Sequence, residues 1–162
     1  MSAIGSYAVL KRSEWPTCLA RARDVRSETS GAGIFKRQRS VGREAFAEAW
    51  QKALVREVPL EYSGYIVGNY LDAQDATNGT HYVDGLAEAE RALSQVFTAG
   101  FVFDAPVSFP DLDRDRLLAF CRSEYGDDDA AGMVEAIEAA HTFYGRGMAE
   151  ITAEHLVVFV IR

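Results

Sequence analysis

The feature that most constrains the fold is an unbroken apolar run, LVVFVI, at residues 156–161. A short run of this kind, bounded by polar residues, is typical of a buried β-strand. The nearly continuous run FTAGFVF at 97–103 predicts a second strand, and AIGSYAVL at 3–10 predicts a third. We expect the two most apolar strands, 99–103 and 156–161, to lie in the middle of one small sheet.

The segments between these strands have the apolar spacing of helices. Phe46, Trp50 and Ala53 share one face of a helix predicted over about 43–56, which ends before Pro59. The basic stretch 34–40 predicts a loop or a short hairpin. Further helices are expected at about 13–27, 84–96 and 111–126, capped by Ser13, Asp84 and Asp111, and from Asp127 onward.

The segment 63–76 is compatible with two structures. Its apolar residues share a helical face, whereas Ile66-Val67 and the nearby tyrosines favour a strand. We predict a helix because Asn78-Gly79 is a typical helix end. The fold class is therefore α+β, with five to six helices packed on a small mixed sheet that includes both chain termini. The whole chain, 1–162, is expected to form a single globular domain.

Composition limits the class of protein. With 162 residues and 48% apolar residues, the chain can bury a substantial core and is not a disordered sequence. No apolar run approaches the roughly 20 residues that span a bilayer, and the N-terminus does not resemble a signal peptide. Cys18 and Cys121 are far apart and lie in helical patterns, which predicts buried thiols rather than a disulfide framework. These features favour a cytoplasmic location.

Charge is distributed unevenly along the chain. Residues 1–56 contain 11 Lys or Arg and 5 Asp or Glu, whereas residues 57–162 contain 6 and 19. The basic part is either a surface for an anionic partner or is neutralised by the acidic part on folding. A nucleic-acid partner is disfavoured because the net charge is −7 and no nucleic-acid-binding motif is present. The acidic residues between Asp111 and Asp129 suit a basic protein partner.

The motifs of common enzymes and metal sites are missing from the sequence. We find no GxSxG, HExxH, CxxC or Walker A pattern, and the three histidines lack metal-ligand spacing. Asp127–Asp129 lack the alternating spacing of a calcium loop and are better explained as the first turn of a helix. We therefore expect no catalytic residues, no metal and no cofactor.

A cluster of tyrosines and polar residues is the strongest candidate for a binding surface. Tyrosines among polar neighbours are common at recognition surfaces, although some of these rings would also suit the core. The candidate partner-binding residues are Tyr62, Tyr65, Asn69, Tyr70, Asp72 and Asp75. The alternative is an anion-binding site formed by Lys36, Arg37, Arg39 and Arg43. The three arginines would act as an anion clamp that faces Tyr65, Asn69 or Asp72.

Three pieces of the sequence resemble the YfbM-like family of small bacterial proteins. They are the opening Ile4-Gly5-Ser6-Tyr7, the helical segment 49–54 (AWQKAL), and a late helix with Tyr144 before a final apolar strand. These pieces cover about a quarter of the chain. The resemblance implies an α+β fold and no assigned activity.

Two functions of different classes follow from these observations. The first is a non-catalytic cytosolic binding protein, an immunity protein that inhibits a bacterial toxin by occluding its active site. Its small size, acidic character and aromatic–polar cluster favour this function. The alternative is a small enzyme or ligand-binding domain for a phosphorylated or nucleotide metabolite, which would use the arginines as an anion clamp.

Overall fold

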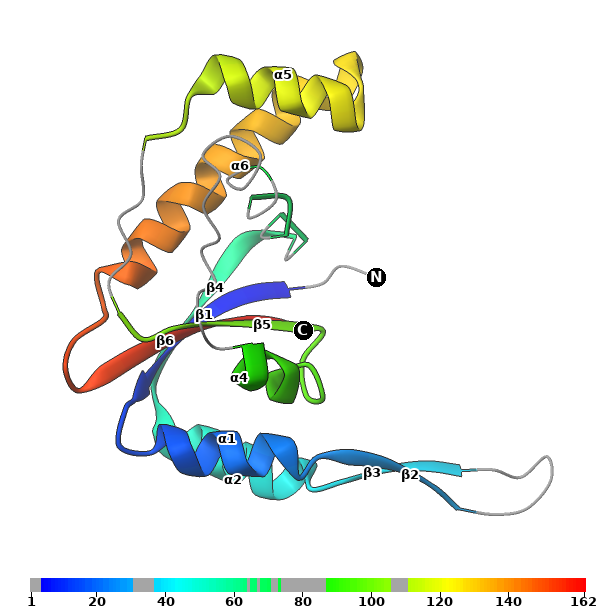
Figure 1. Ribbon diagram of the computed structural model, residues 1–162, viewed down its shortest axis with the longest axis vertical. Helices are drawn as coiled ribbons and strands as arrows, with labels where there is room; N and C mark the ends of the chain where they lie inside the picture. The colour runs from blue at the N-terminus through cyan, green and yellow to red at the C-terminus, as the bar shows by residue number, and fades with distance from the viewer. Residues whose placement is uncertain are drawn as a thin grey trace.

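The computed structural model describes residues 4–30, 37–63, 65–66, 68–70, 73, 87–105 and 111–162. Its centre is a four-stranded sheet with the order β4-β1-β6-β5 (Figure 1). The strands are β1 (Ile4–Lys11), β4 (Leu54–Ser63), β5 (Ala99–Phe103) and β6 (His155–Ile161). All pairs of described strands in this sheet are antiparallel, so the sheet is not mixed as predicted. The predicted α+β class, with strands from both ends of the chain in one sheet, is confirmed.

The centre of the sheet is occupied by β1 and β6, so the prediction that 99–103 lies in the middle is wrong. The apolar run of β5 misled the sequence argument because a helix covers one of its faces. In the described part of the chain, β6 is the only strand that pairs with β5. β1 and β6 are hydrogen-bonded over seven residue pairs, from Gly5↔Ile161 to Lys11↔His155. Their alternate side chains enter two different cores.

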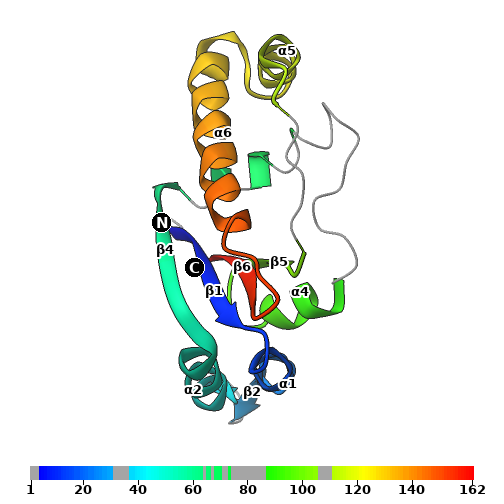
Figure 2. The same ribbon diagram turned by 90° about the vertical axis from the view of Figure 1, so that its left-hand side faces the viewer.

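One core lies on the side of the sheet covered by α6 (Asp127–Met148). α5 (Arg114–Tyr125) packs on α6 and adds Leu117 and Cys121 to this core. It receives Tyr7 from β1 and Phe159 from β6. The other core lies on the side covered by α1 (Trp15–Arg23), α2 (Arg43–Ala53) and α4 (Ala87–Leu93), and it receives Leu10 and Val158. Figure 2 shows α6 on one side of the sheet and the pair α1 and α2 on the other.

The helix predicted over 13–27 is shorter than expected. α1 ends at Arg23, and Arg26–Ser30 instead forms β2, which pairs with β3 (Arg37–Val41) in a separate two-stranded antiparallel sheet. The segment 34–40, predicted as a loop or a short hairpin, contributes only the second arm of this hairpin, and the first arm lies N-terminal to it. Figure 1 shows the hairpin extending beyond α1 and α2, away from the central sheet.

The prediction that the second helix reaches Arg56 is also wrong. α2 ends at Ala53, and β4 begins at Leu54 and continues through Pro59. A proline is compatible with this strand because β4 is at the edge of the sheet, where one side of the backbone needs no partner. Charged residues and a proline hid this strand from an argument based on apolar runs.

The remaining predicted helices agree better with the structure. Residues 65–66, 68–70 and 73 are helical, as chosen for 63–76, whereas Ser63 ends β4. Asp113, rather than Asp111, caps α5 by accepting a hydrogen bond of 3.1 Å from the backbone N–H of Arg116. The first residues of α6 are the acidic run 127–129, as predicted.

Gly42 is a position where the backbone requires glycine. Its φ is +85°, and a Cβ there would lie 2.9 Å from the carbonyl oxygen of Asp24. We expect Gly42→Ala to lower the free energy of unfolding by about 1–3 kcal/mol, measured by urea denaturation. Gly132→Ala is the control because it lies within α6 with nothing near the added Cβ, and it should stabilise by up to about 1 kcal/mol. Equal effects at the two positions would contradict this account.

Candidate functional site

Tyr70, one of the predicted partner-binding residues, belongs to the core. It is 0% exposed, and its ring stacks on Tyr144 with centroids 5.1 Å apart. Tyr144 stacks in turn on Phe159 of β6, at 4.7 Å. The expectation of a surface role for Tyr70 is therefore wrong, because the helical segment that carries it packs against α6 and the sheet.

The other residues of the predicted surface do not form a described cluster. Tyr65 is 58% exposed, and Asn69 is partly exposed. The backbone of Tyr62 belongs to β4, and its side chain lies outside the described structure, as do Asp72 and Asp75 entirely. Of the six candidates, Tyr65 is the one with a described, exposed aromatic ring.

The predicted anion clamp is represented by Arg43 alone. Lys36 lies outside the described residues, and for Arg37 and Arg39 the structure describes the backbone in β3 but not the side chain. Arg43 begins α2, on the side of the sheet opposite the core that contains Tyr70. The sheet therefore separates Arg43 from Tyr70. Among the described residues no side-chain bond joins Arg43 to Tyr65 or Asn69, which the clamp was expected to face, and Asp72 lies outside these residues.

Arg43 also differs from the other basic side chains of the N-terminal part. Among the described residues it forms no ion pair or hydrogen bond through its side chain, whereas every other described Lys or Arg side chain in 1–56 forms one. Arg23 pairs with Glu88 of α4, for example, and Lys52 pairs with Glu14, each at 3.0 Å. The basic residues with such partners are Lys11, Arg12, Arg21, Arg23, Arg26, Lys52 and Arg56.

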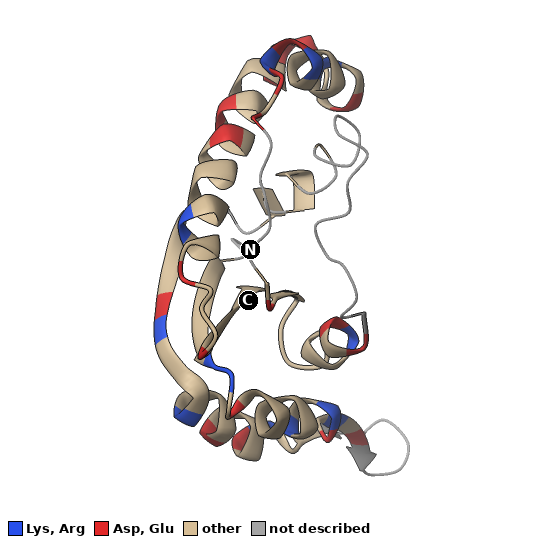
Figure 3. Ribbon diagram, turned by 60° about the vertical axis from the view of Figure 1, so that its left-hand side comes forward, with Lys and Arg blue, Asp and Glu red and all other residues tan. Residues whose placement is uncertain are grey.

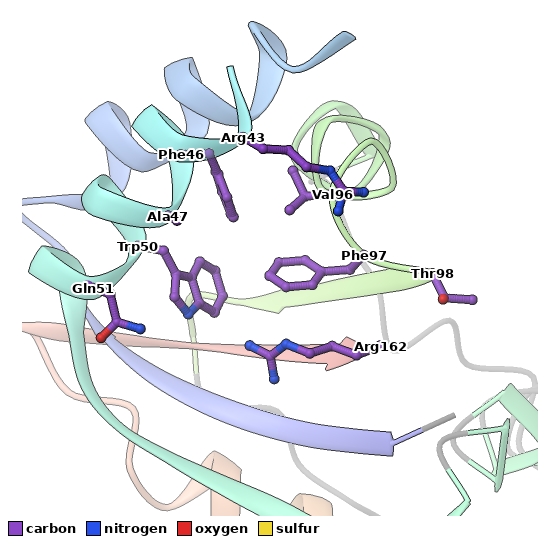
Figure 4. Close-up of a pocket in the computed structure, with 9 residues that line it drawn as sticks. All are labelled: Arg43, Phe46, Ala47, Trp50, Gln51, Val96, Phe97, Thr98 and Arg162. Atoms are coloured by element: carbon purple, nitrogen blue, oxygen red, sulfur yellow. The ribbon is translucent and has the colours of Figure 1, made fainter. Parts of the chain in front are cut away.

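Arg43 lines a cavity of about 530 Å³ between α2 and the segment that leads into β5 (Figure 4). Phe46 and Trp50 of α2 and Phe97 form its aromatic wall. Their rings contact one another, with centroids 5.1 Å apart for Trp50 and Phe97 and 5.7 Å for Phe46 and Phe97. We name this cavity the arginine–aromatic pocket; its principal lining residues are Arg43, Phe46, Trp50, Gln51, Phe97 and Arg162.

The second arginine of the pocket, Arg162, is held in place by the sheet. Its guanidinium carbon lies 5.1 Å from the centre of the Phe97 ring, within the range of a cation–π contact. It pairs with both carboxylate oxygens of Glu57 from β4 and donates a hydrogen bond of 3.2 Å to Ser6 Oγ from β1. Ser6 Oγ in turn donates a hydrogen bond to Glu57 Oε1. Burial alone would raise the pKa of Glu57, but the hydrogen bonds from Arg162 and Ser6 and the Arg162 charge outweigh it and lower the pKa.

The buried indole of Trp50 has an unusual feature. Trp50 is 3% exposed, yet its Nε1–H has no hydrogen-bond partner among the described residues. Buried N–H groups are normally paired, so an unpaired one beside a cavity is a candidate contact for a ligand. The pocket therefore combines an aromatic wall, two guanidinium groups and a hydrogen-bond donor.

The sequence indicated parts of this pocket but not the whole. The spacing of Phe46 and Trp50 predicted their shared helical face, and Arg43 was already an anion candidate. Phe97 and Arg162 come from distant segments that the sheet brings together. Only a correct strand order would have placed them beside α2.

A second surface, the acidic end, is formed by residues 111–129 of α5 and the start of α6. Its described acidic side chains are exposed, and Figure 3 shows red segments at this end of the molecule. Arg122 pairs with Asp127, and Arg114 pairs with Glu138 of α6. The exposed acidic residues are Asp111, Asp113, Asp115, Glu124, Asp127, Asp128 and Asp129, against three arginines.

Other candidate chemistry is weak in the described part of the chain. Cys18 and Cys121 are both fully buried and free, as predicted, and burial raises the pKa of Cys18 to about 12. In these residues no group of three or more His, Cys, Asp or Glu could hold a metal ion. The helices described here are all too short or too polar to cross a membrane.

Comparisons with protein-family models, with curated proteins and with solved structures found no match to this chain. The resemblance to the YfbM-like family therefore stays a prediction from the residues that carry it.

The two tyrosines of the predicted surface should respond differently to substitution. Tyr70→Ala removes a ring from the core stack and should lower the free energy of unfolding by about 3–5 kcal/mol. Tyr65→Ala removes an exposed ring and should change it by less than about 0.5 kcal/mol. Urea denaturation measures both, and a small effect of Tyr70→Ala would show that its ring is not part of the core.

Glu57 should make stability depend on pH. Because its pKa is lowered on folding, its ionised form stabilises the fold above its ordinary pKa of 4.5, and this contribution is lost as the pH falls through the folded value. We expect Glu57→Gln to cost about 1–2 kcal/mol at pH 7 and progressively less towards pH 3. Glu28→Gln, in an exposed pair with Arg26, is the control and should cost little at any pH. An effect of Glu57→Gln that does not vary with pH would contradict the proposed role of the carboxylate.

Proposed function

We propose that this protein is a non-catalytic cytoplasmic binding protein, and that it acts as an immunity protein that occludes the active site of a bacterial toxin. The observation that carries the proposal is the charge left exposed after folding. Five of the eight described basic side chains of the N-terminal part are paired with carboxylates, and Lys11 and Arg12 bond to backbone carbonyls. The acidic end, in contrast, keeps an excess of exposed carboxylates. An acidic surface of this kind accelerates association with a basic protein.

Toxins that act on nucleic acids or nucleotides have basic clefts, because their substrates are anionic. An acidic inhibitor needs only shape and charge complementarity to block such a cleft, with a few anchor residues providing most of the affinity. The exposed Tyr65 remains a candidate anchor from the predicted tyrosine surface.

The test is a pull-down from host lysate at low and moderate salt, read by mass spectrometry, followed by an activity assay of the captured protein. We expect the wild type to retain one stoichiometric protein and to inhibit its activity. The double variant Asp115→Lys/Asp128→Lys reverses two exposed charges at the acidic end, and it should associate at least about tenfold more slowly.

The matched control is Glu44→Lys/Glu48→Lys, which makes the same change in net charge on the exposed surface of α2. It should behave as the wild type. Tyr65→Ala tests the tyrosine surface in the same assay and should increase the dissociation rate if this ring is an anchor. Retention of no stoichiometric protein, or equal association rates for the two double variants, would refute the proposed role of the acidic end.

A second candidate function is a ligand-binding domain for a phosphorylated or nucleotide metabolite. The arginine–aromatic pocket favours it, because its volume of about 530 Å³ lies in the usual range of small-molecule sites. Arg43, one of the predicted anion-binding residues, lines this pocket.

A further inference from the structure

We infer that the arginine–aromatic pocket binds a flat aromatic ring that carries an oxyanion, either a carboxylate or a phosphate. This inference rests on the second candidate function and is independent of the acidic end. Three observations carry it: the aromatic wall, the positive charge at the cavity, and the buried donor of Trp50.

The wall of the pocket suits a flat apolar group. Phe46, Trp50 and Phe97 are contributed by α2 and by the segment before β5, and Val96 extends the same apolar surface. Figure 4 shows the three rings grouped together, with the two arginine side chains on opposite sides of Phe97. A ring that lies against this wall would be within reach of a guanidinium at either side.

The charge at the pocket selects against cationic rings, although aromatic walls often bind cations. Two guanidinium groups line the cavity, and one carboxylate, that of Glu57, is bonded to Arg162. Arg43 has no partner among the described residues and adds an uncompensated positive charge. A guanidinium binds carboxylates and phosphates through two parallel hydrogen bonds, so Arg43 is the expected anchor of the oxyanion.

Trp50 adds a requirement for a hydrogen-bond acceptor. Its buried Nε1–H has no partner among the described residues, and an oxyanion offers only acceptors. Trp50 and Arg162 line the same cavity, and Figure 4 shows the nitrogen at the edge of the indole on the Arg162 side. An oxygen bound there would satisfy the indole and lie near a guanidinium.

Gln51 is a described residue that could compete for the same donor. It is exposed and lines the pocket beside Trp50, so a rotation of its side chain could offer its amide oxygen to the indole. The experiment therefore includes a variant without this amide.

The test is nuclear magnetic resonance of the ¹⁵N-labelled protein. The chain has two tryptophans, so in a Trp15→Phe background the indole N–H signal belongs to Trp50 alone. The probes are benzoate and phenyl phosphate, which distinguish the two oxyanions, and benzyl alcohol, which has the ring without the charge. We expect a saturable shift of the Trp50 signal with at least one charged probe and none with benzyl alcohol.

Substitutions then locate the anion. Arg43→Gln should weaken binding of the charged probe at least about tenfold. Arg146→Gln, on α6 at the other side of the sheet, removes the same charge and should leave binding unchanged. Trp50→Phe keeps an aromatic ring but removes the indole N–H, and it should weaken binding. Because this variant lacks the indole signal, binding is followed by the fluorine signal of fluorine-labelled benzoate.

Three results would overturn the inference. The first is the absence of a saturable shift with either charged probe up to about 10 mM. The second is equal binding of the charged probe by Arg43→Gln and by the parent protein. The third is a shift of the ligand-free Trp50 signal in Gln51→Ala, which would show that the Gln51 amide already occupies the indole donor. Failure of both probes would not bear on the proposal that the acidic end binds a protein partner, because that proposal is tested with different variants. If the pull-down retained no protein partner, the probe titration would still test the pocket.

Discussion

The antiparallel pairing of β1 with β6 is the constraint on which the rest of this structure depends. Both strands lie in the middle of the sheet and are buried on both faces, so each needs helices on two sides. α6 covers one face, and α1, α2 and α4 cover the other. Strands that are apolar on both faces can be stable only in such a layered arrangement, because each uncovered face would expose a row of large side chains.

This arrangement explains which parts of the fold the sequence could predict. The runs of β1, β5 and β6 are apolar enough to be recognised, and the spacing in α2 and α6 is clearly helical. β4 was missed because an edge strand needs fewer apolar residues and tolerates Pro59. Without β4, the sequence argument placed β5 in the middle, although β6 is its only partner in the described sheet.

The candidate sites were harder to predict because the two faces of the sheet are not visible in the sequence. Tyr70 was expected on a binding surface, but it lies in the core below α6. Arg43 was expected in a clamp facing Tyr65, Asn69 or Asp72, but it lies in α2 and lines a cavity on the other side of the sheet. Spacing along the chain distinguishes a surface tyrosine from a core tyrosine only when the element that covers it is known. Tyr144, which covers Tyr70, is more than seventy residues away in the sequence.

The same sheet that separates the predicted residues also assembles the pocket that was not predicted. Glu57 on β4 holds the guanidinium of Arg162, Arg162 lies against Phe97, and Phe97 contacts Trp50 of α2. These four residues come from four segments whose positions depend on the strand order, so the pocket exists only in the folded protein. A ligand that binds there must therefore stabilise the fold, by a free energy that grows with the logarithm of its concentration above its Kd, since the unfolded chain offers no such site. Thermal stability and occupancy of the pocket should consequently rise together, which connects the packing of the sheet directly to whatever this pocket holds.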